Sequence, residues 1–143
     1  MTKTIFKTLG LTALFTVIAI GLTACRSNAQ SSENTGYDSS ISKGLNAVAE
    51  DEMDRAVTYF TNALDQKPKD KKATAYLKQA QSYVNTDKQL ADGNPEKAVK
   101  TVAQGMKVKH GAKSLDAKLS QLQKTTKADW VSINNWTRLS QRS

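Results

Sequence analysis

Residues 54–68 read DRAVTYFTNALDQKP and contain the clearest structural pattern of the chain. Its apolar residues recur three or four positions apart, with Ala56, Phe60 and Ala63 in one line and Pro68 at the end. That spacing places the three side chains on one face of an α-helix. The two small residues let a neighbouring helix approach closely, and the large one fills the space between the helices. The stretch therefore predicts a helix that packs against other helices.

Helical spacing continues on both sides of this stretch, with further apolar stripes that begin at Ile41, Ala73, Ala98 and Ala112. No run alternates between apolar and polar residues as a half-buried strand does. Abundant Ala, Leu, Lys and Gln residues also favour helix, and there are only two Pro residues in the chain. We therefore predict an all-α domain of about five helices, followed by a short C-terminal helix.

One of these stripes repeats the pattern of the first. In residues 96–110, the residues Ala98, Val102 and Gly105 occupy the same offsets as the three packing residues named above. The two stretches resemble the second helix of a tetratricopeptide repeat (TPR), which has Ala, an aromatic residue, Ala and Pro at these offsets. The resemblance covers about residues 41–122. It implies a short TPR-like stack of antiparallel helical hairpins, a fold that usually binds peptides.

The chain also departs from the TPR pattern. Ala56 and Ala98 are farther apart than the family period of about 34 residues. We therefore expect the third helix to continue through residues 85–91. Gly105 and His110 stand where the family has its second Ala and its Pro. A generic helical bundle with Ala-rich seams is the alternative interpretation.

The N-terminus is typical of an export signal. Lys3 and Lys7 precede an uncharged apolar run over residues 9–22. The run has the length of a signal-peptide core and is shorter than an ordinary membrane-spanning helix. It closes with a quartet of small or apolar residues and a Cys, namely Leu22, Thr23, Ala24 and Cys25.

This quartet resembles the lipobox of bacterial lipoproteins. The resemblance implies that residues 1–24 are a signal peptide that is removed, and that Cys25 becomes the first residue and carries diacylglycerol and palmitate. Such a protein is held by its lipid on the extracytoplasmic face of the cell membrane. Membrane lipid is then a partner, and no cofactor is expected beyond the covalent lipid. The alternatives are an uncleaved signal anchor and secretory cleavage after Ala29.

Residues 26–40 are rich in Ser and Asn, and Tyr37 is their only large apolar residue. A segment of this composition cannot bury enough surface to order itself. We therefore expect residues 25–40 to form the lipidated Cys and a flexible tether. Residues 41–127 then form the TPR-like domain, and residues 128–143 form a C-terminal amphipathic tail.

Positive charge is unevenly distributed along the chain. The formal net charge is +8, and most of the excess lies after residue 66. Anionic envelope polymers or lipid headgroups suit this asymmetry, whereas no nucleic acid is expected to meet an exported protein. A solvated Lys-rich surface is the structural alternative. The candidate contacts form two clusters: Lys67, Lys69, Lys71 and Lys72 in the first, and Lys107, Lys109, Lys113 and Lys118 in the second.

Both Trp residues of the chain lie in the C-terminal tail. Trp130, Ile133 and Trp136 recur three residues apart, which predicts a short helix with an apolar face. In one interpretation this helix caps the open end of the stack. In the other it is an exposed face for a partner or for the membrane interface. We favour the cap, because an unprotected apolar end is a liability.

Catalytic chemistry has little support in the sequence. One Cys and one His leave no disulfide framework, zinc cluster or Cys–His dyad. Gly-rich phosphate loops and nucleophile elbows are absent, so we predict no catalytic residues, no metal site and no enzyme activity. The expected function is that of a membrane-anchored protein-binding or scaffold module in the cell envelope. The alternative is a structural envelope protein that binds anionic polymer or lipid through its basic C-terminal half.

Overall fold

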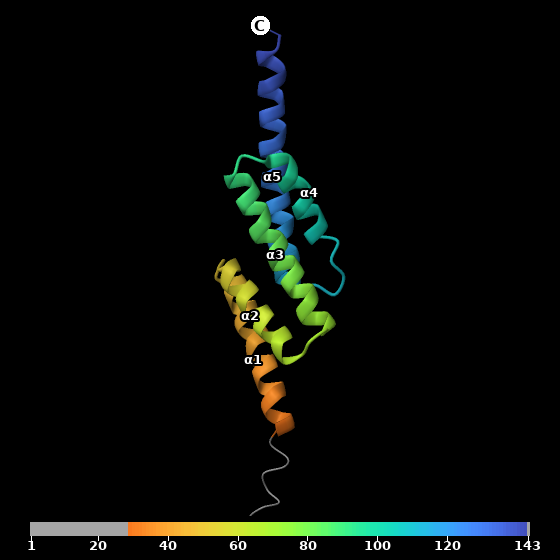
Figure 1. Ribbon diagram of the computed structural model, residues 1–143. Helices are drawn as coiled ribbons and strands as arrows, with labels where there is room; N and C mark the ends of the chain where they lie inside the picture. The colour runs from red at the N-terminus through yellow and green to blue at the C-terminus, as the bar shows by residue number, and fades with distance from the viewer. Residues whose placement is uncertain (1–28, 143) are drawn as a thin grey trace, which may run out of the picture. The chain divides into compact units, whose positions relative to one another are not determined.

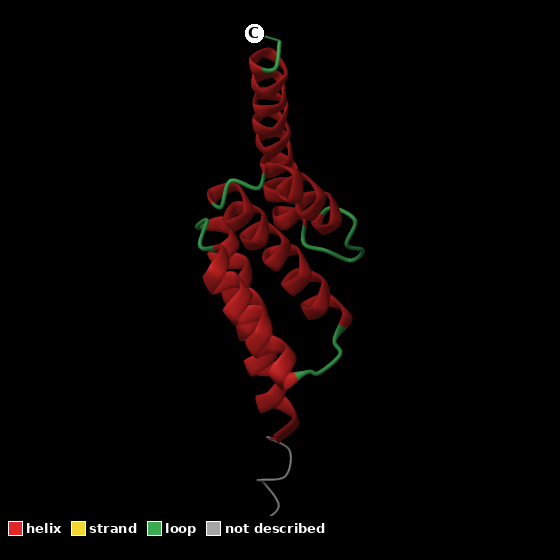
Figure 2. Cartoon of the chain, turned by 45° about the horizontal axis from the view of Figure 1, so that its top comes forward, coloured by secondary structure: helices red, strands yellow, loops and turns green. Residues whose placement is uncertain are grey.

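The computed structural model describes residues 29–142. These residues form five α-helices: α1 (Ala29–Ala49), α2 (Met53–Gln66), α3 (Lys71–Ala91), α4 (Pro95–Gly105) and α5 (Lys113–Ser140) (Figure 1). Within this range there is no strand, so the predicted all-α fold is confirmed (Figure 2). The chain divides after Thr35, and the unit that begins at Gly36 holds the packed core. Among the described helices, none is both long enough and apolar enough to cross a membrane.

Helices α1 and α2 form an antiparallel hairpin around Gly44 and Phe60. A Cβ at Gly44 would overlap the Phe60 ring, so the missing side chain lets the two helices approach closely. Farther along the hairpin, Gln66 Nε2 donates to Ser40 Oγ over 3.4 Å. Phe60 is fully buried, and its ring meets that of Tyr76 in α3 edge-on, with the centroids 5.5 Å apart. This aromatic pair joins the hairpin to α3.

Helix α3 is shared between the first hairpin and the C-terminal helices. Helix α4 packs against it at Gly105, where a Cβ would lie 2.6 Å from Ser82 Cβ. On its other side, α4 places Val102 in a buried cluster with Leu119 of α5. The result is a stack of helices in which each neighbour along the chain packs back on the one before it (Figure 1).

The residues predicted to pack between helices lie where the helices meet. Six of them are buried: Ala56, Phe60, Ala63, Ala98, Val102 and Gly105. Pro68 differs, because it is exposed in the turn after α2 and stops that helix without packing. Helix α3 continues through residues 85–91 as expected and ends at Ala91.

Helix α1 begins earlier than the sequence predicted. Residues 29–40 were expected to belong to a flexible tether, and the structure places them in this helix instead. Tyr37 is only 6% exposed, and its hydroxyl donates to Asp70 Oδ1 over 2.7 Å. Tyr37 is therefore packed in the core and hydrogen-bonded to a residue 33 positions away. These contacts anchor a segment of polar composition.

Asp70 connects the Tyr37 hydroxyl of α1 to the start of α3. Its carboxylate also accepts a hydrogen bond from the Ala73 backbone N–H over 2.8 Å, which caps the helix. These two donors, the Ala73 N–H first and the Tyr37 hydroxyl second, hold the pKa of the Asp70 carboxyl below its usual range. Burial, with the nearby Asp70, raises the pKa of Tyr37.

Helix α5 is one continuous helix rather than a packed helix followed by a separate cap. Its buried residues are Leu115, Leu119, Leu122 and Thr126. Of the described residues after Thr126, none is buried. We call residues 127–140 the arm, and Figure 1 shows its blue ribbon continuing past the ends of α3 and α4. The first turns of the arm lie beside the turn between α3 and α4, where Asp129, Ser132 and Ile133 line a pocket with Leu90, Gly93 and Pro95. The rest of the arm continues beyond the stack and does not fold over it (Figure 1).

Candidate functional site

The predicted lipidation site lies outside the described residues, which begin at residue 29. The lipobox quartet Leu22, Thr23, Ala24 and Cys25 therefore remains a prediction. Two features within the described residues are candidates for binding: an open basic pocket and the arm.

The basic pocket has a volume of about 550 Å³ and lies between the start of α3 and the loop that joins α4 to α5, residues 106–112. It brings together parts of both predicted lysine clusters, although they are far apart in the sequence. Its lining is Lys69, Lys71, Thr74, Ala75, Lys78, Val108, Lys109 and His110.

Five residues of this lining were not among the predicted contacts, and two of the five, Lys78 and His110, have basic side chains. Lys78 could have been found from helical spacing, because it lies seven positions after Lys71 and so shares its face of α3. His110 could not have been found in this way, because nothing in its local sequence links it to α3.

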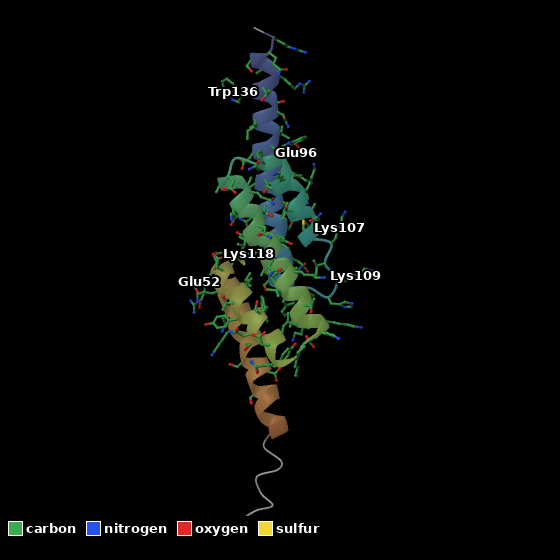
Figure 3. The ribbon with its side chains drawn as sticks, in the orientation of Figure 1. Glu52, Glu96, Lys107, Lys109, Lys118 and Trp136 are labelled. Carbon is green, nitrogen blue, oxygen red and sulfur yellow. The ribbon has the colours of Figure 1, made fainter. Side chains whose placement is uncertain are left out.

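The remaining predicted lysines lie outside the pocket lining. Lys67 Nζ lies 4.2 Å from the centre of the Tyr37 ring, and Lys72 Nζ lies 5.8 Å from the centre of the Tyr76 ring. Three others are placed as follows: Lys118 forms an ion pair with Asp51, and Lys107 and Lys113 are exposed (Figure 3). The predicted clusters therefore divide into lysines that serve the fold, lysines in solvent and lysines at the pocket.

A buried glutamine fixes the loop that forms one wall of the pocket. Gln79 is fully buried; its Oε1 accepts from the Ala112 N–H over 2.9 Å, and its Nε2 donates to Asp116 Oδ1 over 2.5 Å. Gly111 lies directly against this amide, because a Cβ there would overlap it. The loop is therefore pressed onto α3, and the residues just before Gly111 are held at the pocket rim.

Two residues of the pocket lining have left-handed backbone conformations. Lys69 has φ 67° and His110 has φ 63°, values that glycine adopts far more readily than residues with a Cβ. Asp51, in the turn between α1 and α2, is the other described non-glycine residue of this kind. Strain of this sort often accompanies a functional side chain.

A second pocket, near the turn between α1 and α2, has a volume of about 410 Å³ and a mixed lining in which acidic residues outnumber basic ones. Its charged residues are Asp51, Asp54, Asp87 and Lys88. Burial raises the pKa of the Asp87 carboxyl. In the part of the chain that the structure describes, no group of three His, Cys, Asp or Glu side chains gathers as a metal site would require.

The arm carries the largest exposed apolar side chains of the described residues. Trp130 is 39% exposed, Ile133 is 50% exposed and Trp136 is 76% exposed. Figure 3 shows Trp136 projecting from the arm away from the other helices. Leu139, one turn farther on, is also exposed. The structure therefore agrees with the exposed-face interpretation of these residues.

Comparison with protein-family models, with curated proteins and with solved structures finds no match for this chain.

Proposed function

We propose that the protein is a lipid-anchored extracytoplasmic lipoprotein of the cell envelope, and that its helical stack presents the arm to a partner protein. The observation that carries this proposal is the exposure of Trp130, Ile133 and Trp136 on a helix that continues beyond the stack. The resemblance of residues 22–25 to a lipobox supports the location.

The chemistry of the arm suits protein binding. Trp side chains give large, rigid contact areas with one polar group, and they are enriched among the residues that dominate binding energy. Asn134, Asn135 and Arg138 lie beside Trp130 and Val131 along a shallow surface groove of the arm. Neither Ile133 nor Trp136 lines this groove, so the arm offers a mixed polar and apolar surface there. Mixed surfaces of this kind are usual at interfaces between proteins.

The rest of the structure suits a scaffold. Contacts such as the Gly44–Phe60 packing and the Gln79 hydrogen bonds hold the hairpins and their loops in place. A rigid stack of this kind fixes where its arm begins, so the arm can be presented at a constant position relative to the domain.

Site-specific photo-crosslinking in intact cells tests the proposal. A photoreactive residue in place of Trp136 is expected to capture one discrete envelope protein, because this side chain is 76% exposed on the arm. The matched control places the same photoreactive residue at Lys97, which is exposed on α4. Adding Trp130→Ser to the Trp136 crosslinker is expected to reduce the adduct by about tenfold or more, as loss of an interface Trp does.

Three results would contradict the proposal. The first is the same set of adducts from both crosslinker positions. The second is an adduct at Trp136 that Trp130→Ser leaves unchanged. The third is capture of lipid alone, which would assign the arm to the membrane interface instead of to a protein.

A further inference from the structure

We propose that the basic pocket at the start of α3 is a binding site for the phosphate groups of a polyanionic chain. The proposal does not depend on the arm or on the lipid anchor. It rests on the convergence of Lys69, Lys71, Lys78, Lys109 and His110 around one opening of about 550 Å³.

The lysines of the pocket are available to a ligand. Lys69, Lys71, Lys78 and Lys109 all reach solvent, and none of them takes part in the ion pairs found among the described residues. The pocket lining contains no carboxylate. Four positive charges that face one opening without a counter-charge create a strong local attraction for an anion.

The acidic residues nearest in sequence to this lining are already engaged. Asp70 lies between two of the lysines, but its carboxylate accepts from Tyr37 and from the backbone of Ala73. Asp116 accepts from Gln79, which is fully buried. Both carboxylates are therefore held by neutral donors in the walls, and neither of them lines the opening.

The rim opposite α3 is held in place before any ligand binds. Gln79 bonds the Ala112 N–H, and Gly111 leaves no room between the loop and that amide. Lys69 and His110 keep left-handed conformations at the two sides of the opening, where a glycine would be less strained. A fixed arrangement of cations loses less entropy on binding than a mobile one, so it favours affinity.

The number of lysines favours a ligand with several negative charges. Lysine binds phosphate as a compact point charge, and the cations of the lining are lysines together with His110. Four lysines also supply more charge than a single carboxylate requires. The opening is shallow and open to solvent, and its floor at Ala75 and Val108 is apolar. These features suit a chain that carries successive phosphates past the rim, with each phosphate kept near the solvent.

The test uses the purified full chain with short-chain inorganic polyphosphate as the probe, at a salt concentration of about 0.15 M. The pocket variant combines Lys69→Gln, Lys78→Gln and Lys109→Gln. The control variant combines Lys43→Gln, Lys97→Gln and Lys124→Gln, which removes the same charge from exposed positions outside the pocket. Calorimetric titration is expected to show a loss of affinity of about tenfold or more for the pocket variant and about twofold for the control.

A third variant keeps every lysine and changes only the pocket floor. Val108→Asp places a negative charge among the lysines, and we expect it to weaken polyphosphate binding by about tenfold or more. Thermal unfolding followed by helical circular dichroism is measured for all variants, so that a loss of binding is assigned to the pocket only where the fold is retained.

Vesicles of phosphatidylglycerol distinguish the two sources of phosphate. If the pocket variant loses more vesicle binding than the control does, and polyphosphate binds weakly, the phosphates belong to lipid headgroups and the assignment to a polyanionic chain is overturned. If only polyphosphate binding depends on the pocket, they belong to a polymer. Equal losses of polyphosphate affinity in the pocket and control variants would overturn the proposal. Polyglutamate that binds as tightly as polyphosphate would overturn it too, because it would assign the pocket to acidic peptides.

Discussion

Replacing Phe60 with Ala is expected to lower the free energy of unfolding by about 3–5 kcal/mol. The Phe60 side chain is fully buried, packs directly over Gly44 of α1 and meets the Tyr76 ring of α3. Removing it leaves a cavity at the point where three helices meet, and Gly44 has no side chain with which to fill it. A domain of this size is stable by only about 5–15 kcal/mol, so the loss is a large part of the total.

Urea unfolding of the full chain, followed by helical circular dichroism, measures this effect. Trp fluorescence is unsuitable here because both Trp residues lie on the arm. Met106→Ala is the matched control: this side chain is 39% exposed at the end of α4, and we expect its removal to cost less than about 0.5 kcal/mol. A loss of less than about 1 kcal/mol for Phe60→Ala would show that the first hairpin does not close on α3 as described.

Replacing Cys25 with Ser is expected to abolish maturation of the chain altogether. A hydroxyl cannot take the place of the thiol in thioether formation, so the diacylglyceryl group is not attached. We expect the variant to accumulate as a precursor that retains residues 1–24. Intact mass spectrometry of the membrane fraction measures both changes, namely the retained signal peptide and the missing lipid.

Ser27→Ala is the control for this substitution, because it alters the same segment and leaves the quartet at residues 22–25 intact. It is expected to be processed and lipidated like the unaltered chain. If Cys25→Ser were instead cleaved and held at the membrane to the same extent as the control, the lipoprotein proposal would be wrong.

The helices were predictable because their signal is local. Apolar residues at three- and four-residue spacing define the stripes of α2 to α4, and the extra length of α3 followed from the distance between the repeats. The start of α1 was not predictable in this way. It depends on the packing of Tyr37 and on its bond to Asp70, and a polar segment with one aromatic residue gives no local sign of such a distant partner.

For the arm, the spacing of apolar residues predicts the helix but not its surroundings. The spacing of Trp130, Ile133 and Trp136 correctly indicates a helix, but it contains no information on whether another element covers that helix. Coverage depends on where the arm points, and α5 continues straight beyond Thr126 because no Gly or Pro interrupts residues 113–140.

The basic pocket was predictable in part. Both clusters were predicted from the many lysines close together in the sequence. Only the fold shows that Lys109 lies next to α3 and that Lys118 forms an ion pair with Asp51. The decisive residue, Gln79, gave no signal, because a polar side chain in a helical stripe is ordinarily exposed. The burial of Gln79 is explained by the hydrogen bond that its side-chain oxygen accepts from the Ala112 N–H.

The fluorescence of the arm shows whether it is an exposed surface on the isolated chain. Acrylamide quenching of intrinsic fluorescence reports on the arm alone, because Trp130 and Trp136 are the only Trp residues of the protein. In the isolated chain we expect strong quenching of Trp136, which is 76% exposed, and weaker quenching of Trp130, which is 39% exposed. Blue-shifted emission protected from acrylamide would contradict this expectation, because the two side chains would then be covered by the chain's own helices.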